Sequence, residues 1–547
     1  MLRRRNLSPA RVVRLLAGGV AGFVGLAVLL YFTSAHFQAG TSDGATVILE
    51  GQALASGHVL LHGWVLTVSS YWTSSAVFDG LAILLGGLRA GLLYATPAVA
   101  GAVAVAVGAL LAREGRRGWA GFAGAVAVVA LLAFSAPALS FFFVGRGFHV
   151  STAGYALLAF IALRRVKFGW GWALAVLMLS AGMLGDLLMV AYGVVPLAIA
   201  GCVAMARERR LRAGMVEFTA AVASVVLTWV THLALAAFGA FTTSTPRPVI
   251  RSSQMITNLG HVPVYVASLF GLTDSVVTSG GVFGQLRNVH GLGIVNSAAA
   301  LCVLACVVFA LVSLVVGLAG RSPRGRLVDG EPGPWRLDNT LVIAVLCAAV
   351  PFVFFAGRDG AGIRYLTVCV VFASVLAGRM IARAGTSLRT ARSIRAFALA
   401  GAVLALGMVA SFGYAMSGPQ LSNSVTRLAA WLETDGLHEG IGGYWVASIT
   451  TVETGGAVTV RPVLAGNGGQ IERQLKLSSA GWYEGSHFRF LVLGAPIGYG
   501  GIREVVTTWG RPEHVEVIGP YRVLVWSHRL AWPPPHRGPP AIQALPS

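Results

Sequence analysis

Residues 293–319 read GIVNSAAALCVLACVVFALVSLVVGLA, an uncharged apolar stretch, and the arginines Arg321, Arg324 and Arg326 follow it. The hydrocarbon core of a bilayer is about 30 Å thick, and a helix needs about 20 apolar residues to span it. The stretch therefore predicts a transmembrane helix that ends at a basic loop.

Ten further apolar stretches occur between the N-terminus and residue 415. The eleven predicted spans lie at residues 13–34, 92–112, 118–138, 150–163, 170–185, 187–206, 216–238, 293–319, 339–356, 364–382 and 396–415. The fourth and fifth are short, as expected for a tilted, partial or re-entrant segment. The first follows five arginines but is too long for a signal peptide and lacks a convincing cleavage site, so we expect a retained anchor.

The composition leads to the same class of protein. Of 547 residues, 56% are hydrophobic and 11% are charged, whereas about 25% are charged in soluble proteins. The mean hydropathy is +0.73. These values exclude a soluble globular protein.

The basic residues predict the orientation. There are 41 Lys and Arg against 21 Asp and Glu, a net charge of +20 that would suggest a nucleic-acid partner in a soluble chain. With a cytoplasmic N-terminus, 24 basic residues fall in inside segments, seven in outside loops of the membrane part and ten in the C-terminal region. Because Lys and Arg concentrate in cytoplasmic loops, we expect this orientation in the plasma membrane and no nucleic-acid partner.

Beyond residue 415 the composition changes. Alternating apolar runs at Val458–Val463, His487–Leu493 and Arg522–Trp526 predict strands, and residues 421–437 have helical spacing. The predicted fold class is an all-α polytopic membrane protein with about 11 transmembrane helices and a C-terminal extracytoplasmic α+β domain. We expect a multi-span part at 1–415 with a long first outside loop at 35–91, the α+β domain at 416–530, and a Pro-rich disordered tail at 531–547.

Carboxylates are few enough to sort by side of the membrane. The inside set lies among arginines or at helix ends, where solvation alone would explain it; it comprises Glu114, Glu208, Glu217, Asp329, Glu331 and Asp338. The outside set in the membrane part comprises Asp43, Glu50, Asp79, Asp186, Asp274 and Asp359. No carboxylate lies in the middle of a span, so the sequence shows no proton relay.

The first outside loop opens with a predicted helix start. Ser42 is the expected cap, and the apolar side chains around Ile48 suit the membrane surface. Asp43 and Glu50 are seven residues apart and would share one helix face. Asp43 is equally explained as a charge that stabilises a helix N-terminus.

The same loop carries several aromatic and histidine residues. Trp64, Tyr71 and Trp72 are more readily explained as interfacial anchors than as ligands. His58 and His62 lack a third ligand, so no metal site is expected there. The cofactor is unknown, since no cluster demands an ion, and a divalent metal is left open.

Three other outside points carry charge at the ends of spans. Asp186 follows Gly185 in a tight turn, where a carboxylate needs a partner or water. A second point is the segment Gly145-Arg146-Gly147-Phe148-His149. At the third, near residues 357–365, we expect Arg358 to snorkel or pair with Asp359, while Arg364 suits bidentate phosphate contact.

Together these features resemble the membrane glycosyltransferases of the C-type superfamily, in the style of the protein mannosyltransferase and aminoarabinose transferase families and of bacterial transferases that use polyprenyl-phosphate sugars. The architecture of the whole chain carries the resemblance, with motifs at Ser42-Asp43, Gly185-Asp186 and Arg364-Tyr365. Gly44 stands where several relatives carry a second acid, which leaves Glu50 as a distant substitute.

The resemblance implies a hexosyl- or pentosyltransferase that inverts the anomeric centre. It would move a sugar from a polyprenyl-phosphate donor to an acceptor of the cell envelope, which is a glycan, lipid or protein. Asp43 would be the general base, and Arg364 with Tyr365 would bind the donor phosphate. Asp186, His149 and Glu50 would orient the substrate. Four aromatic residues of the C-terminal domain would stack on sugar or pack in its core: Trp445, Trp482, Tyr483 and Trp509.

Two other classes of function fit parts of the sequence. A transporter or flippase for a lipid-linked glycan predicts ionisable groups along a path through the bilayer. A non-catalytic membrane scaffold with an outside binding domain would leave Asp43 without a role.

Overall fold

The structure, a computed structural model, describes residues 9–38, 40–116, 118–145, 148–165, 169–244, 248–273, 293–319, 335–357, 362–421, 424–465, 471–484, 487–494, 505 and 509–531. The expectations for Arg146, Asp274, Arg358, Asp359 and the tail after residue 531 lie outside these residues.

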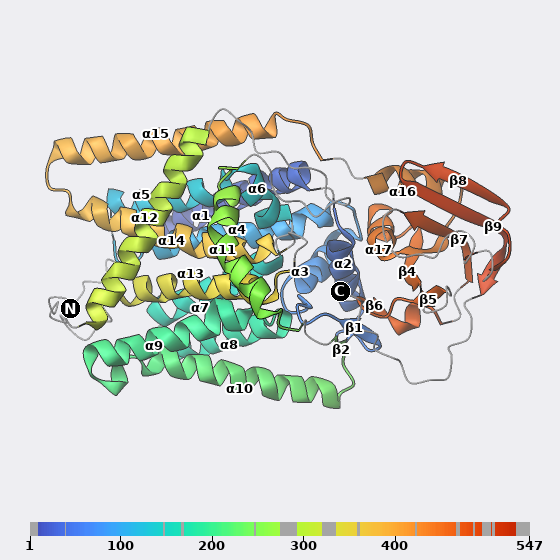
Figure 1. The fold of residues 1–547 in the computed structure, drawn as a ribbon, viewed down its shortest axis with the longest axis horizontal. Helices are drawn as coiled ribbons and strands as arrows, with labels where there is room; N and C mark the ends of the chain where they lie inside the picture. Colours follow the sequence, from blue (N-terminus) through green and yellow to red (C-terminus); the bar gives the residue numbers. More distant parts are fainter. Residues whose placement is uncertain are drawn as a thin grey trace.

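Each of the eleven predicted spans coincides with a helix (Figure 1). These helices are α1 (Pro9–Phe37), α4 (Leu92–Arg113), α5 (Trp119–Ala133), α7 (Phe148–Arg165), α8 (Trp170–Gly185), α9 (Val195–Glu208), α10 (Met215–Ala237), α12 (Gly293–Leu318), α13 (Trp335–Phe355), α14 (Ile363–Ser387) and α15 (Ala391–Met416). Among the described helices, eight are long and apolar enough to cross a membrane, and one bent pair would be a ninth. The helices α7 and α8 are shorter, as the sequence indicates. The chain is a multi-pass membrane protein.

The third predicted span is bent rather than straight. After α5 the chain turns by 84° into α6 (Pro137–Ser140) and the π-helical η1 (Phe141–Gly145). Pro137 disfavours helical backbone at the residue before it, and Ala136 is extended with ψ 155°. A second π-helical turn, η2 (Val190–Val194), leads into α9.

The helix α14 is the centre of the bundle, and most of its residues are buried. It packs against α5, α13, α4, α12 and α7. At the closest crossing, a Cβ on Gly378 would lie 2.6 Å from the backbone oxygen of Gly124, so only glycine fits there. This packing fixes α14, and with it Arg364 in its first turn.

The first outside loop folds into α2 (Ser42–Ala55), β1 (Trp64–Leu66) and α3 (Ser75–Gly86). The helix start is confirmed, but the predicted cap is wrong by one residue. Thr41 caps α2, since its backbone is extended and its side chain accepts from the N–H of Gly44, 3.2 Å away. The neighbouring Ser42 is already helical and fully buried.

The apolar face of α2 lies inside the protein and not on the membrane surface. Val47, Ile48 and Leu49 are each less than 5% exposed, because α3 and the C-terminal helix α17 cover them. It is α3 that exposes an apolar face, with Leu81 and Leu85 55% and 91% exposed.

The loop after α10 holds two elements that the sequence did not indicate, β2 (Thr242–Thr243) and α11 (Ser252–Leu269). Polar residues interrupt α11, so it has no apolar run long enough to predict a transmembrane span. One of them, Asn258, donates to the carbonyls of Phe352 and Ala356, 3.2 and 3.1 Å away, and ties α11 to the end of α13.

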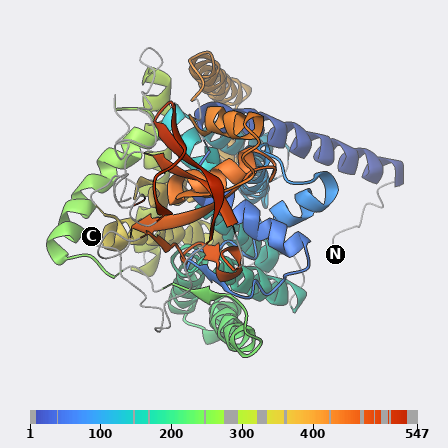
Figure 2. The ribbon, with the colours of Figure 1, turned by 90° about the vertical axis from the view of Figure 1, so that its right-hand side faces the viewer.

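The C-terminal region is an α+β domain, as predicted. A six-stranded mixed sheet has the order β5-β4-β3-β7-β9-β8, with the strands β3 (Glu439–Gly443), β4 (Thr459–Ala465), β5 (Ile471–Arg473), β7 (His487–Gly494), β8 (His514–Ile518) and β9 (Tyr521–Ala531). It is accompanied by α16 (Ser424–Thr434) and α17 (Tyr444–Glu453). Figure 2 shows this sheet in front of the helical bundle, at one end of it.

This domain is joined to the first outside loop. The strand β1 pairs with β6 (Ser478–Ser479) of the C-terminal domain, and the rings of Trp64 and Trp482 lie 4.9 Å apart. The helix α17 packs along α2, and the Thr46 hydroxyl donates to Ser448, 3.0 Å away. The first turn of α2 is therefore held by the C-terminal domain.

Candidate functional site

Asp43 lies in the first turn of α2, half-buried, where α17 begins. The Tyr444 hydroxyl, at the start of α17, donates a hydrogen bond to its Oδ1. Burial raises the pKa of Tyr444 well above its usual value, and the charge of Asp43 raises it further. Tyr444 is therefore a neutral donor at any physiological pH, and it fixes one oxygen of the Asp43 carboxylate.

Tyr71 is buried near several charged and polar groups. It is only 7% exposed, so the interpretation of Trp64 and Tyr71 as interfacial anchors is wrong for both, since Trp64 is 5% exposed. Burial raises the pKa of Tyr71 well above its usual value; Asp186 and Asp43 raise it further, while Arg364 opposes the rise. The charges of Asp186, Asp43 and Arg364 thus all act on Tyr71.

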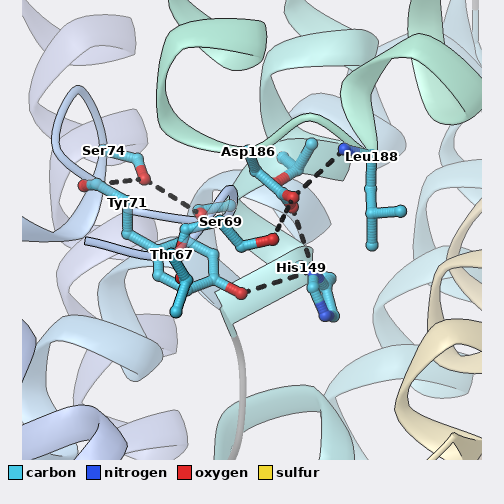
Figure 3. Close-up of polar contacts among 9 residues, drawn as sticks. Thr67, Ser69, Tyr71, Ser74, His149, Asp186 and Leu188 are labelled. Atoms are coloured by element: carbon cyan, nitrogen blue, oxygen red, sulfur yellow. Dashed lines mark hydrogen bonds and ion pairs between the residues drawn. The ribbon is translucent and has the colours of Figure 1, made fainter. Parts of the chain in front are cut away.

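The backbone at Tyr71 is unusual. Its φ is +55°, in the left-handed region that non-glycine residues rarely occupy. Its N–H donates to the carbonyl of Gly185, 2.7 Å away, and its own carbonyl accepts from the N–H of Ser74, 3.0 Å away. These bonds hold the first outside loop against the end of α8 and turn the Tyr71 ring towards His149 (Figure 3). Strained residues of this kind cluster at functional sites.

His149 and Asp186 form a buried pair beside Tyr71 (Figure 3). His149 Nδ1 is 2.9 Å from Asp186 Oδ2 and 3.4 Å from the Tyr71 hydroxyl. Because an ionised carboxylate only accepts hydrogen bonds, Nδ1 carries a proton and the Tyr71 oxygen accepts from it as well. The ring of His149 also lies 5.4 Å from the ring of Tyr365.

Asp186 has the partners that a charge at the membrane edge requires. Besides His149, the Ser69 and Thr152 hydroxyls and the N–H of Leu188 donate to it at 2.8, 2.7 and 3.1 Å. Burial by itself would raise the pKa of Asp186, but the charge of His149 and these hydrogen bonds outweigh burial and lower it. Asp186 is thus ionised although it is only 1% exposed.

Arg364 stands in the first turn of α14, half-buried. Its guanidinium carbon is 5.3 Å from the centre of the Tyr365 ring. Its Nε is buried and has no hydrogen-bond partner among the residues described here. A guanidinium with a buried N–H group that lacks a partner is suited to bind an anion.

Glu50 is sealed inside the protein, between α2 and α3. It is 0% exposed, and neither of its oxygens has a hydrogen-bond partner in the described part of the chain. Burial raises the pKa of Glu50 well above its usual value, and the neighbouring Asp79 adds to the rise. Burial also raises the pKa of Asp79 to about 8, although a hydrogen bond from Thr96 opposes it. Both groups are thus predominantly neutral acids at neutral pH, and Glu50 is not open to a substrate.

Of the six predicted site residues, five gather around Tyr71: Asp43, His149, Asp186, Arg364 and Tyr365. The sequence did not single out Tyr444, and it assigned Tyr71 to the membrane surface. In the described residues no group of three His, Cys, Asp or Glu side chains is arranged to hold a metal ion. The arrangement offers a carboxylate and a guanidinium whose charges both act on Tyr71.

The aromatic residues proposed for sugar stacking have different fates. Tyr483 is 2% exposed and donates to the carbonyl of Pro462, so it belongs to the domain core. Trp482 packs between Trp64 and Arg461, whose guanidinium is 4.5 Å from its ring. Trp445 is 36% exposed and follows Tyr444 directly, so it is accessible next to Asp43.

The comparisons with known proteins bear on the fold. The solved structure of ArnT from Cupriavidus metallidurans, in the apo state, matches with a TM-score of 0.51 over 93% of this chain and 98% of that one. The two sequences are 13% identical, so the likeness shows a shared fold. No protein-family model and no curated protein sequence matches the chain. The predicted fold class is therefore confirmed, and the role of each residue is a matter for proposal.

Proposed function

We propose that the chain is a membrane glycosyltransferase that moves a sugar from a polyprenyl-phosphate donor to an acceptor on the extracytoplasmic side. The fold that it shares with the aminoarabinose transferase ArnT supports the class of enzyme. The observation that carries the proposal is the gathering of Asp43, Arg364 and the His149–Asp186 pair around Tyr71.

Asp43 acts as the general base. The acceptor hydroxyl gives its proton to the carboxylate while its oxygen attacks the anomeric carbon. Tyr444 occupies Oδ1, so the proton goes to Oδ2. The N-terminus of α2 favours a charge at this position, and base and cap are therefore compatible roles for Asp43.

Arg364 binds the phosphate that leaves. As the bond between the anomeric carbon and the phosphate oxygen breaks, the electron pair stays on the phosphate and its charge increases. A guanidinium fixed at the start of α14 stabilises that charge more in the transition state than in the bound donor. The free Nε of Arg364 and the adjacent Tyr365 supply donors for the contact.

His149 and Asp186 hold the Tyr71 ring in place. Their hydrogen-bond network links α7, the end of α8 and the first outside loop. Trp445 is the accessible ring for the acceptor sugar. The distribution of basic residues supports a cytoplasmic N-terminus, with this end of the bundle on the outer side of the plasma membrane.

The test is the Asp43→Asn variant of the full chain. It should express and fold like the wild type and lose sugar transfer from a panel of polyprenyl-phosphate hexoses and pentoses. Asp435→Asn, at an exposed carboxylate of the C-terminal domain, is the matched control and should keep full activity. Transfer at the wild-type rate by Asp43→Asn would show that Asp43 is not the general base.

A further inference from the structure

A second polar site lies at the opposite end of the bundle from Asp43. There, α9 and α14 end, α13 begins, and the second half of α12 passes by, towards the left of Figure 1. A cavity of about 210 Å³ opens between these helices. Its lining includes Arg207, Arg383, Asp338, Asn339, Trp335 and Phe309.

Carboxylates around this cavity have arginine partners. Asp338 and Arg379 form a buried ion pair at 2.6 Å, and they are 6% and 1% exposed. Glu208 pairs with Arg336 at 2.5 Å, and Glu217 lies 3.8 Å from the same guanidinium. The expectation that solvation alone explains the inside carboxylates is therefore wrong for Asp338. With Asp338 neutralised by Arg379, Arg207 and Arg383 make the cavity wall basic.

Two residues that line the cavity carry buried polar atoms without hydrogen-bond partners in the described part of the chain. Asn339 is 5% exposed, and its Nδ2 has no hydrogen-bond partner among the described residues. The same holds for Oδ2 of Asp338, whose other oxygen receives Arg379. A buried donor and a buried acceptor that are left unsatisfied each cost free energy. A ligand with both a hydrogen-bond acceptor and a hydroxyl group would satisfy them together.

The other wall of the cavity is apolar and continues onto the outer surface of the bundle. Phe309 and Val316 of α12 line the cavity and are 54% and 39% exposed. Arg207 lies over the ring of Trp335, 4.3 Å from its centre, at the rim. A free anion in water gains nothing from an apolar wall, whereas a lipid has acyl chains to lay against it.

We propose that this cavity binds the headgroup of an anionic phospholipid with a glycerol headgroup. The phosphate accepts from Arg383 and Arg207 at the rim, as in basic pockets between transmembrane helices. A headgroup hydroxyl accepts from Asn339 Nδ2 and donates to Asp338 Oδ2. The acyl chains follow the exposed face of α12.

The test uses the full chain, purified and delipidated, with native mass spectrometry to count bound lipid. We expect phosphatidylglycerol to be retained about tenfold more tightly than phosphatidylcholine, whose headgroup has no hydroxyl. Arg383→Ala and Asn339→Leu should each lower retention of phosphatidylglycerol by about tenfold and leave phosphatidylcholine unchanged. Arg392→Ala, at an exposed arginine of α15 outside the cavity lining, is the control and should change neither.

Three results would overturn the proposal. One is equal retention of the two lipids by the wild-type chain, a result that does not depend on the folding of any variant. Another is unchanged phosphatidylglycerol retention in both folded variants. The third is displacement of phosphatidylglycerol by millimolar inorganic phosphate, because that would identify a site for the free anion. None of these readouts depends on sugar transfer.

Discussion

The hydrogen bond from Tyr444 to Asp43 makes a specific prediction about catalysis. Tyr444→Phe keeps the aromatic ring at the start of α17 and removes only the hydroxyl that donates to Oδ1. Asp43 then loses the contact that fixes the orientation of its carboxylate. The base is still present, but it is correctly oriented for a smaller fraction of the time.

The size of the effect follows from the burial of the two partners. A hydrogen bond to a charged group contributes about 1.5–3 kcal/mol, equivalent to roughly 10- to 150-fold in rate. Asp43 is half-buried, so water replaces part of the lost contact, and the lower end applies. We expect kcat to fall about tenfold, while KM for the lipid donor stays within about twofold, because the donor contacts Arg364.

The assay is transfer from a polyprenyl-phosphate sugar by the purified chain, with kcat and KM measured separately. Tyr521→Phe is the matched control, since the Tyr521 hydroxyl makes a 2.8 Å hydrogen bond with Ser424 within the C-terminal domain. It should leave both constants unchanged. An unchanged kcat in Tyr444→Phe, or an equal loss in both variants, would refute a specific role for Tyr444 in positioning the base.

Three further predictions concern the donor site and the packing of the first outside loop. Arg364→Ala should lower kcat/KM for the donor about 100-fold, and Arg364→Lys, which keeps the charge, should recover part of it; equal activity of all three forms would contradict phosphate binding. The pKa of Asp79 is raised to about 8, so the folded chain retains a proton that the unfolded chain releases near pH 4. The free energy of unfolding that Asp79 contributes is therefore full below pH 4 and falls as the pH rises towards 8. Asp79→Asn should therefore flatten the decline of the thermal midpoint between pH 5 and 8, and a parallel decline in both proteins would contradict the assignment. Gly51→Ala should destabilise the chain by about 1–3 kcal/mol, because its Cβ would lie 2.6 Å from Asp79 Cβ, whereas Gly401→Ala, with no atom within 4 Å, should not; equal midpoints would disprove the tight crossing of α2 and α3.

The helices and strands could be predicted because their signals are local. A run of apolar residues long enough for the bilayer identifies a span wherever it lies, and the structure has a helix at all eleven. Likewise, the spacing of Val425, Leu428 and Leu432 predicts the buried face of α16, and all three are buried. Apolar runs predict neither the bend at Pro137 nor the helix α11, because a run does not show a bend and polar residues interrupt α11.

The candidate site could be predicted only in part. Asp43, Asp186 and Arg364 stand out because charge is rare in this chain. Their partners do not stand out: Tyr444 is 401 residues from Asp43, and the sequence context of Tyr71 is typical of a residue at the membrane surface. Whether an aromatic residue faces lipid or protein depends on which element covers it, and here the C-terminal domain and α7 do so.

A structure of the chain with a polyprenyl-phosphate sugar bound would test the proposed reaction most directly. We expect the phosphate to contact the guanidinium of Arg364. The anomeric carbon should lie on the side of Asp43, so that an acceptor hydroxyl between them is about 2.6–3.2 Å from Oδ2. A donor bound with its phosphate away from Arg364, or with its sugar out of reach of Asp43, would contradict the proposed site.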